Sequence, residues 1–280
     1  MSISNSAVLV ELNISLWTAA ITDKTATKKV ADDSNASADA GMFKKNLMAG
    51  TTKRKAIADY AAICRTWHNN NTMPWSDRGP RLLPTARLLD YKSKMNQLQA
   101  KFEELVDDFC ADYPTLVQMA PQYLGNLFNP ADYPSPEEVR TKFGFRLVMS
   151  PVPESGDFRI DTGMEELDEL RKEYDLAFES RVKDAMRDPW NRLHETLTKM
   201  AEKLGSEEES RWSSKFVTNA QDLCSLLSDL NVTKDPQLEQ ARQQLERALS
   251  GVYVEDLKDD GFLRGQVKDK LDAILKQYEW

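Results

Sequence analysis

The clearest pattern of apolar and polar positions begins at residue 85, where apolar residues recur at alternating spacings of three and four. The series consists of Leu88, Tyr91, Met95, Leu98, Phe102, Leu105 and Phe109. This spacing places all of them on one side of a helix, as in the seam of a coiled coil. The pattern therefore predicts a long helix that packs its seam, including Leu98 and Phe102, against a second helix.

A matching series of apolar residues begins at Met164 and continues to residue 204. Asp188-Pro189 interrupts it, and an Asp followed by Pro is typical of the capped start of a new helix. Two heptad segments in one chain predict an antiparallel helical hairpin, with 86–117 paired against 165–204.

The N-terminal residues show three different patterns. Residues 7–17 are rich in Val, Leu and Ile and partly alternate, which predicts a strand. Residues 22–41 are polar and small, which is typical of a loop or mobile segment. Apolar spacing over 42–67 indicates a helix that Gly50 weakens, and three asparagines at 69–71 then favour a turn.

Between the two long helices the pattern changes. Residues 120–142 are rich in proline and predict turns with one short helix near Ser135. Alternating apolar residues over 143–161, divided by Pro-Glu-Ser-Gly, predict a β-hairpin near the tip of the helical hairpin.

Amphipathic spacing predicts three further helices, over 213–232, 236–252 and 262–280. The expected fold class is therefore mainly α with a small β component (α+β). The expected parts are an N-terminal strand, mobile loop and basic helix (1–84), the helical hairpin with its β-tip at 143–161 (85–205), and a C-terminal helical segment (206–280).

Composition favours a globular chain, because 41% of the residues are hydrophobic and 29% are charged. No continuous apolar run is long enough for a transmembrane helix, so no membrane partner is expected. The cysteines Cys64, Cys110 and Cys224 are scattered among apolar residues, which is typical of buried thiols in a reducing cytoplasm.

Charge is divided unevenly along the chain. Residues 1–101 carry 15 basic and 8 acidic side chains, whereas residues 102–280 carry 22 basic and 37 acidic ones. Such asymmetry indicates either that the two parts meet different partners or that they pack against each other.

Motifs of catalysis are missing from the sequence. His194-Glu195 lacks the second histidine of a zinc-binding helix, and the sequence contains no glycine-rich phosphate loop and no nucleophile elbow. We therefore expect no enzymatic activity, no cofactor and no metal site, although dispersed Asp and Glu residues leave an enzyme as a third alternative.

A basic and aromatic stretch over 53–87 has two interpretations. Tryptophans among cations can form a stacking and phosphate-binding platform for single-stranded nucleic acid. The alternative is that both rings pack under a loop and that Arg81-Leu-Leu-Pro84 forms a short strand. We favour this alternative, because buried aromatic side chains contribute strongly to the stability of protein cores. The candidate nucleic-acid residues are Lys53, Arg54, Lys55, Arg65, Trp67, Trp75, Arg78, Arg81 and Arg87.

Three segments of the chain carry a resemblance to a known family. They are "TMPWSDRGPRLLP", "YPTLVQMAPQYLGNLFNPADYPS" and "FGFRLVMSPVPESGDFRID", and their order resembles an uncharacterised family of tailed-bacteriophage proteins over residues 66–165. "NISLWTAAITDK" is similar to a broader group of phage and bacterial proteins encoded beside a MoxR-type AAA+ ATPase. The resemblance implies a phage protein in the host cytoplasm, with an AAA+ ATPase as a candidate partner, and it transfers no catalytic residue.

The sequence thus predicts a non-enzymatic phage accessory or adaptor protein that acts through self-association or through another phage or host protein. The alternative is a single-stranded nucleic-acid-binding accessory protein. A partner is expected to dock at the exposed edge of the β-tip, where the charges of Arg146, Asp157 and Arg159 lie beside Phe145. The competing interpretation is that the phenylalanines of the tip pack onto the helices.

Overall fold

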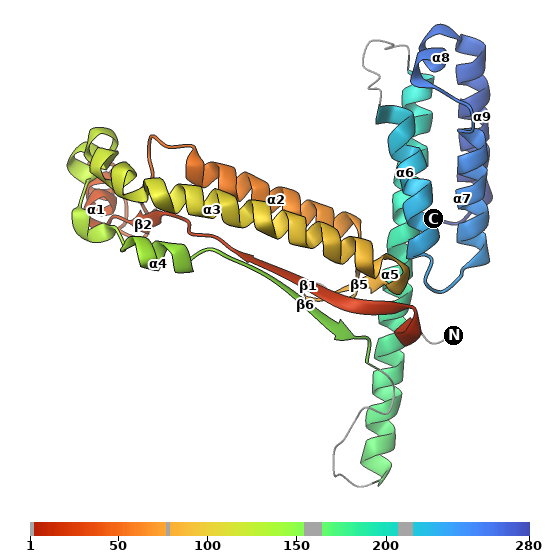
Figure 1. Ribbon diagram of the computed structural model, residues 1–280, viewed down its shortest axis with the longest axis horizontal. Helices are drawn as coiled ribbons and strands as arrows, with labels where there is room; N and C mark the ends of the chain where they lie inside the picture. The colour runs from red at the N-terminus through yellow and green to blue at the C-terminus, as the bar shows by residue number, and fades with distance from the viewer. Residues whose placement is uncertain (1–2, 77–78, 154–163, 207–214) are drawn as a thin grey trace. The chain divides into compact units, whose positions relative to one another are not determined.

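The computed structural model describes residues 3–76, 79–153, 164–206 and 215–280, with the side chains of its longest helix from residue 168 onward. The fold is mainly α with a small β component, as the sequence predicts (Figure 1). The chain forms two compact units. The terminal unit comprises Met1–Glu11, Asn69–Tyr91 and Val148–Trp280, and the inner unit comprises Leu12–His68 and Lys92–Leu147. This division differs from the three consecutive parts expected from the sequence, because the chain passes repeatedly from one unit to the other.

The inner unit is built around two helices, α2 (Lys53–Asn70) and α3 (Leu88–Leu124), which lie side by side (Figure 1). Both helices continue by a few residues into the terminal unit. The other elements of the inner unit are β2 (Ala20–Thr22), α1 (Lys24–Asp33), β3 (Lys44–Asn46), η3 (Gly125–Leu127), η4 (Pro130–Asp132) and α4 (Pro136–Thr141). The strands β1 (Ala7–Ser15) and β6 (Gly144–Pro151) are shared between the two units.

The seam of α3 fills the core of the inner unit. Phe102 and Phe109 are almost fully buried, in one cluster with Ile57 and Ala61 of α2 and with Trp17 after β1. The predicted strand over 7–17 and the predicted short helix near Ser135 are both confirmed, and a capping box at Ser135 starts α4.

The polar segment 22–41 contains a helix, so its prediction as a loop is wrong. Asp23 accepts a hydrogen bond from the amide of Ala26 and caps α1, in which no residue is buried. A helix without a buried face shows no apolar periodicity, which is why the pattern missed it. The predicted helix over 42–67 likewise starts later, at Lys53, because Gly50 adopts a left-handed φ of 82° that ends the preceding turn.

A buried cation organises the end of the inner unit. The Lys45 side chain is only 7% exposed, pairs with Asp23 at 3.4 Å and with Asp132, and donates a hydrogen bond to the Leu127 carbonyl at 3.0 Å. The ion pairs raise the pKa of Lys45, with the Asp132 hydrogen bond as the main cause. One side chain therefore ties β3 to the N-terminus of α1 and to the turn after α3.

Replacing Lys45 by methionine should lower the free energy of unfolding of the inner unit by about 3 kcal/mol, because two carboxylates lose a buried partner. The matched control is Lys55→Met, which removes an exposed ion pair with Asp59 on α2 and should cost less than about 1 kcal/mol. Denaturant unfolding of both variants measures the difference. Equal and small losses would show that the buried cluster does not stabilise the unit.

The terminal unit holds the remaining elements. These are η1 (Ile3–Asn5), β4 (Met73–Pro74), β5 (Arg81–Pro84), η2 (Thr85–Arg87), α5 (Met164–Gly205), α6 (Lys215–Leu230), α7 (Pro236–Ala248), α8 (Val254–Asp259) and α9 (Gly261–Gln277). The strand order of the main sheet is β4-β5-β1-β6, and β5 runs antiparallel to β1 with Leu82 opposite Leu9. The predicted short strand at 81–84 is therefore confirmed.

The C-terminal half of α5 packs with α6, α7 and α9 in a helical bundle (Figure 1). Leu193, Leu197, Leu227 and Leu271 are fully buried in its core.

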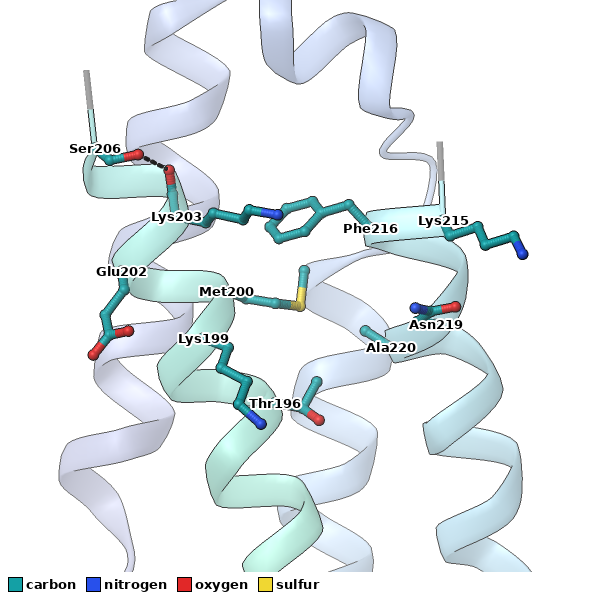
Figure 2. Close-up of a pocket in the computed structure, with 10 residues that line it drawn as sticks. All are labelled: Thr196, Lys199, Met200, Glu202, Lys203, Ser206, Lys215, Phe216, Asn219 and Ala220. Carbon is teal, nitrogen blue, oxygen red and sulfur yellow. Dashed lines mark hydrogen bonds between the residues drawn. The ribbon is translucent and has the colours of Figure 1, made fainter. Parts of the chain in front are cut away.

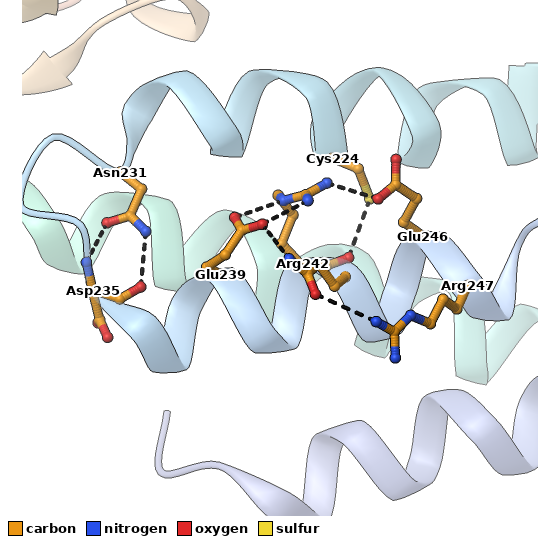
Figure 3. A network of polar contacts seen from close by, with 8 residues as sticks. Cys224, Asn231, Asp235, Glu239, Arg242, Glu246 and Arg247 are labelled. Carbon is orange, nitrogen blue, oxygen red and sulfur yellow. Dashed lines mark hydrogen bonds and ion pairs between the residues drawn. The ribbon is translucent and has the colours of Figure 1, made fainter.

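The connection from α6 to α7 is fixed by polar contacts (Figure 3). Asn231 and Asp235 exchange two hydrogen bonds of 2.7 and 2.8 Å, and Asp235 caps α7 as its sequence predicts. Along α7, Arg242 reaches Glu239 at 2.7 Å and Glu246 at 2.9 Å (Figure 3). The Asn231–Asp235 bonds fix the turn between the two helices, whereas the Arg242 ion pairs lie within α7 itself.

The predicted pairing of the two heptad helices, α3 and α5, is wrong, because their apolar faces pack into different hydrophobic cores. The seam of α3 beyond Tyr91 belongs to the inner unit, with Phe102 packed 5.7 Å from the ring of Phe145. The seam of α5 belongs to the terminal unit. A heptad pattern reports that a face is buried, and it does not identify the partner helix.

The helix α5 also continues through Pro189, where a restart was predicted. Ala185 and Leu193 on either side of the proline are fully buried. Packing on both sides therefore holds the helix together despite the hydrogen bond that proline removes.

The first strand of the predicted β-hairpin is confirmed as β6, which is an end strand of the sheet formed by the described residues. The second strand falls on residues 154–161, which lie outside the described residues. The buried-thiol interpretation is confirmed for Cys64 and Cys224, whereas Cys110 is half-buried. Burial raises the pKa of the Cys224 thiol to about 11.

Candidate interaction surfaces

The cations on α2 that the sequence singled out are engaged within the inner unit. Arg65 donates to the Ile14 carbonyl at 2.8 Å, and Arg54 donates to the Trp17 carbonyl at 3.5 Å. Lys53 pairs with Asp112, and Lys55 pairs with Asp59 at 2.5 Å. Trp67 on the same helix is half-buried.

The second group of predicted residues lies in the terminal unit, where Trp75 is part of the core. Its ring is 5% exposed and meets Phe178 edge to face at 5.5 Å. Arg87 pairs with Asp229 at 3.2 Å and donates to the side chain of Asn71 at 3.0 Å. Arg78 lies outside the described residues. The packing interpretation of Trp75 is therefore the one that the structure shows.

Two guanidinium groups hold the asparagine-rich turn after α2. Arg81 donates to the side chain and the carbonyl of Thr72 at 2.7 and 3.0 Å. Arg192 of α5 donates to the carbonyls of Asn69 and Thr72 at 3.0 and 2.8 Å, and also to that of Asn70. Carbonyls left open at the end of a helix need such donors, and these two guanidinium groups supply them. Arg192 was missed from the sequence because it is distant in the chain and carries no local signal.

Asp188 completes this cluster and has an unusual environment. Its carboxylate lies 2.8 Å from Nε of Arg192, and its side chain is 24% exposed. Burial raises the pKa of Asp188, and the nearby charges of Arg192 and Arg81 only partly oppose this effect. The site is a hollow of about 570 Å³ in which positive and negative groups offset each other. We interpret it as a structural junction.

The Asp188 carboxyl should make stability depend on pH. A raised pKa in the folded chain means that the carboxyl favours folding at low pH and loses this contribution as the pH rises from about 3.8 through the folded pKa. The stability of the wild type relative to Asp188→Asn should therefore fall across that interval. Denaturant unfolding at a series of pH values measures it, and a difference that rises with pH would contradict the assignment.

The predicted docking residues at the β-tip are only partly described. Phe145 packs on Phe102 within the inner unit, so this phenylalanine belongs to the core as the competing interpretation expects. Arg146 points to the surface and is exposed. Asp157 and Arg159 lie outside the described residues, so docking at the tip stays a prediction.

The described residues in the N-terminal half of α5 are largely exposed. Figure 1 shows it extending beyond α6, α7 and α9. From residue 168 to residue 181 each side chain is exposed or half-exposed. The 3–4 spacing nevertheless continues through Leu170, Tyr174 and Ala177 and joins Phe178, which packs on Trp75. An apolar stripe thus runs out of the core along this half-helix.

Metal binding and membrane crossing each need a recognisable set of residues in the described part of the chain. Within those residues, no group of three or more His, Cys, Asp or Glu side chains is placed to hold a metal ion. None of the helices described there has the length and apolar character needed to cross a bilayer. His68 is buried, and His194 stacks on Trp280 at 4.8 Å.

Comparisons with protein-family models, with curated proteins and with solved structures each find no match for this chain. The resemblance to a tailed-bacteriophage family therefore stays a prediction from the sequence.

Proposed function

We propose that this protein acts by association, and that its contact surface is the apolar stripe along the N-terminal half of α5, defined by Leu170, Tyr174 and Ala177. The observation that supports the proposal is the exposure of this half-helix, in which Leu170 is 36% exposed although it continues a buried seam. We assign a second copy of the same stripe as the partner.

The energetics of an isolated helix favour a partner. A helix of about four turns that projects into water is only marginally stable, because most helical stability in proteins comes from packing of the apolar face. Pairing two stripes would bury Leu170 and Ala177 at the contact. Each fully buried leucine contributes about 1.5–3 kcal/mol, so a contact of this length should be weak and dependent on concentration.

The charges beside the stripe suit a contact between identical helices. Arg171 and Glu173 flank Leu170 and Tyr174 with opposite signs, and Asp168 pairs with Arg171 at 3.4 Å within the helix. If the side chains beside the stripe all carried one sign of charge, two copies would repel each other. With both signs present, basic side chains of one helix can face acidic side chains of the other.

Sedimentation velocity of the chain over a range of concentrations tests the proposal. The mass should rise from that of the 31.9 kDa monomer towards twice that value as the concentration increases. A mass that stays monomeric up to millimolar concentration would exclude self-association and leave another protein as the partner of the stripe.

The nucleic-acid alternative has no comparable observation in its favour. Trp75 is buried, and Arg65, Arg81 and Arg87 make hydrogen bonds or ion pairs within their own units. An adaptor role in a phage, with an AAA+ ATPase as partner, rests on the resemblance alone and remains a prediction.

A further inference from the structure

The helices α5 and α6 line an open hollow of about 640 Å³ near the end of α5 (Figure 2). Its floor is formed by two apolar side chains, Met200 and Ala220, which are 3% and 1% exposed. The half-buried ring of Phe216 forms one side. The volume lies within the range of small-molecule sites, which usually combine an apolar lining with a few charged or polar groups.

The charged groups around this hollow are mainly positive. Lys199, Lys203 and Lys215 line it together with one carboxylate, Glu202. In Figure 2 Lys203 reaches across the hollow towards Phe216, with its Nζ 5.3 Å from the ring centroid, whereas Glu202 and Lys215 both point away from the hollow.

Lys199 pairs with Glu195 at 2.8 Å, which partly neutralises its charge. Lys203 is therefore the ammonium group that faces the apolar floor. An ammonium group beside an apolar floor attracts a ligand that carries both a negative charge and an apolar body.

We propose that the hollow between α5 and α6 binds an organic anion with a flat apolar part, such as an aromatic carboxylate, sulfonate or phosphate. The flat part would lie on Met200 and Ala220 beside the ring of Phe216, and the anionic group would face Lys203. A bare inorganic anion would leave the apolar floor without a contact, and a neutral aromatic compound would leave the charge of Lys203 without an anionic partner. The site is separate from the stripe on α5 and does not depend on self-association.

The probe is 1-anilinonaphthalene-8-sulfonate, and its neutral counterpart is N-phenyl-1-naphthylamine. Fluorescence titration of the full chain should show saturable binding of the sulfonate. Lys203→Met should weaken sulfonate binding about fivefold, which is the effect of one exposed charge at contact distance, and should leave binding of the neutral probe unchanged.

Two further variants locate the site. Asn219 is exposed and lines the hollow, so Asn219→Trp should fill it and weaken binding of both probes without disturbing the fold. Lys258→Met makes the same charge change at an exposed lysine of α8 and should leave both probes unaffected. Equal weakening by Lys203→Met and Lys258→Met, or no binding of the sulfonate to the wild type, would overturn the proposal.

Discussion

Replacing Phe109 by alanine should lower the free energy of unfolding of the inner unit by about 3–5 kcal/mol, because truncating a buried aromatic ring leaves a cavity. The ring is fully buried in the described structure. It lies 6.3 Å from the ring of Trp17, 6.1 Å from that of Tyr113 and 5.8 Å from that of Phe143. Several aromatic contacts are lost together with the buried area, so the upper part of this range is expected.

The matched control is Phe262→Ala, which makes the same truncation at a ring that is 77% exposed. It should change the stability by less than about 0.5 kcal/mol, as surface substitutions usually do. Denaturant unfolding followed by circular dichroism measures both variants. A loss below about 1 kcal/mol for Phe109→Ala would mean that the aromatic cluster is not the core of the inner unit.

Replacing Leu170 by glutamate should weaken self-association at least about tenfold. The substitution places a charge in the centre of the contact, where its desolvation costs far more than the contact of one leucine contributes. Because Leu170 is on the surface of the monomer, the fold of the terminal unit should not change.

The chain offers a close control for this variant. Leu176 is 69% exposed on the same half-helix, and at 3.6 residues per turn it lies about 100° or more around the helix from each residue of the stripe. Leu176→Glu therefore adds the same charge to the same helix and should leave the dissociation constant nearly unchanged. Equal weakening by both variants would indicate a general effect of charge, and it would contradict the stripe as the contact surface.

The sequence predicts buried faces well and their partners poorly. The apolar spacing that includes Phe102 and Phe109 identified α3 and the residues that its core buries. The same spacing could not show that Phe102 meets Phe145 instead of α5, since long-range pairing depends on the whole fold.

Local sequence signals for the start of a helix were reliable only where the tertiary packing agreed with them. Asp235-Pro236 starts α7, as predicted, because the Asp235 side chain caps the helix. Asp188-Pro189 is the same pair of residue types, but it lies inside α5. There the packing of Ala185 and Leu193, which are fully buried, keeps the helix continuous. Tertiary packing thus overrides the local preference.

The candidate surfaces were harder to predict than the core. Arg81 and Arg87 looked like a basic surface in the sequence, but backbone carbonyls and carboxylates that cannot be located from the sequence satisfy them. The hollow beside Lys203 was missed, because its lining comes from two helices whose contact has no sequence signature. The exposed stripe on α5 was visible as a heptad pattern, although its exposure was not.

Hydrogen exchange of the backbone amides of residues 168–177 tests the central proposal most directly, because these residues carry the stripe and precede the contact of Phe178 with the core. In dilute solution these amides should exchange rapidly, since the helix lacks a packed partner. At concentrations where the chain associates, exchange should slow in this segment, and Leu170→Glu should abolish that slowing while Leu176→Glu preserves it. Exchange rates that are equal in dilute and concentrated solutions, in a chain shown by sedimentation to associate, would place the contact elsewhere and contradict the account.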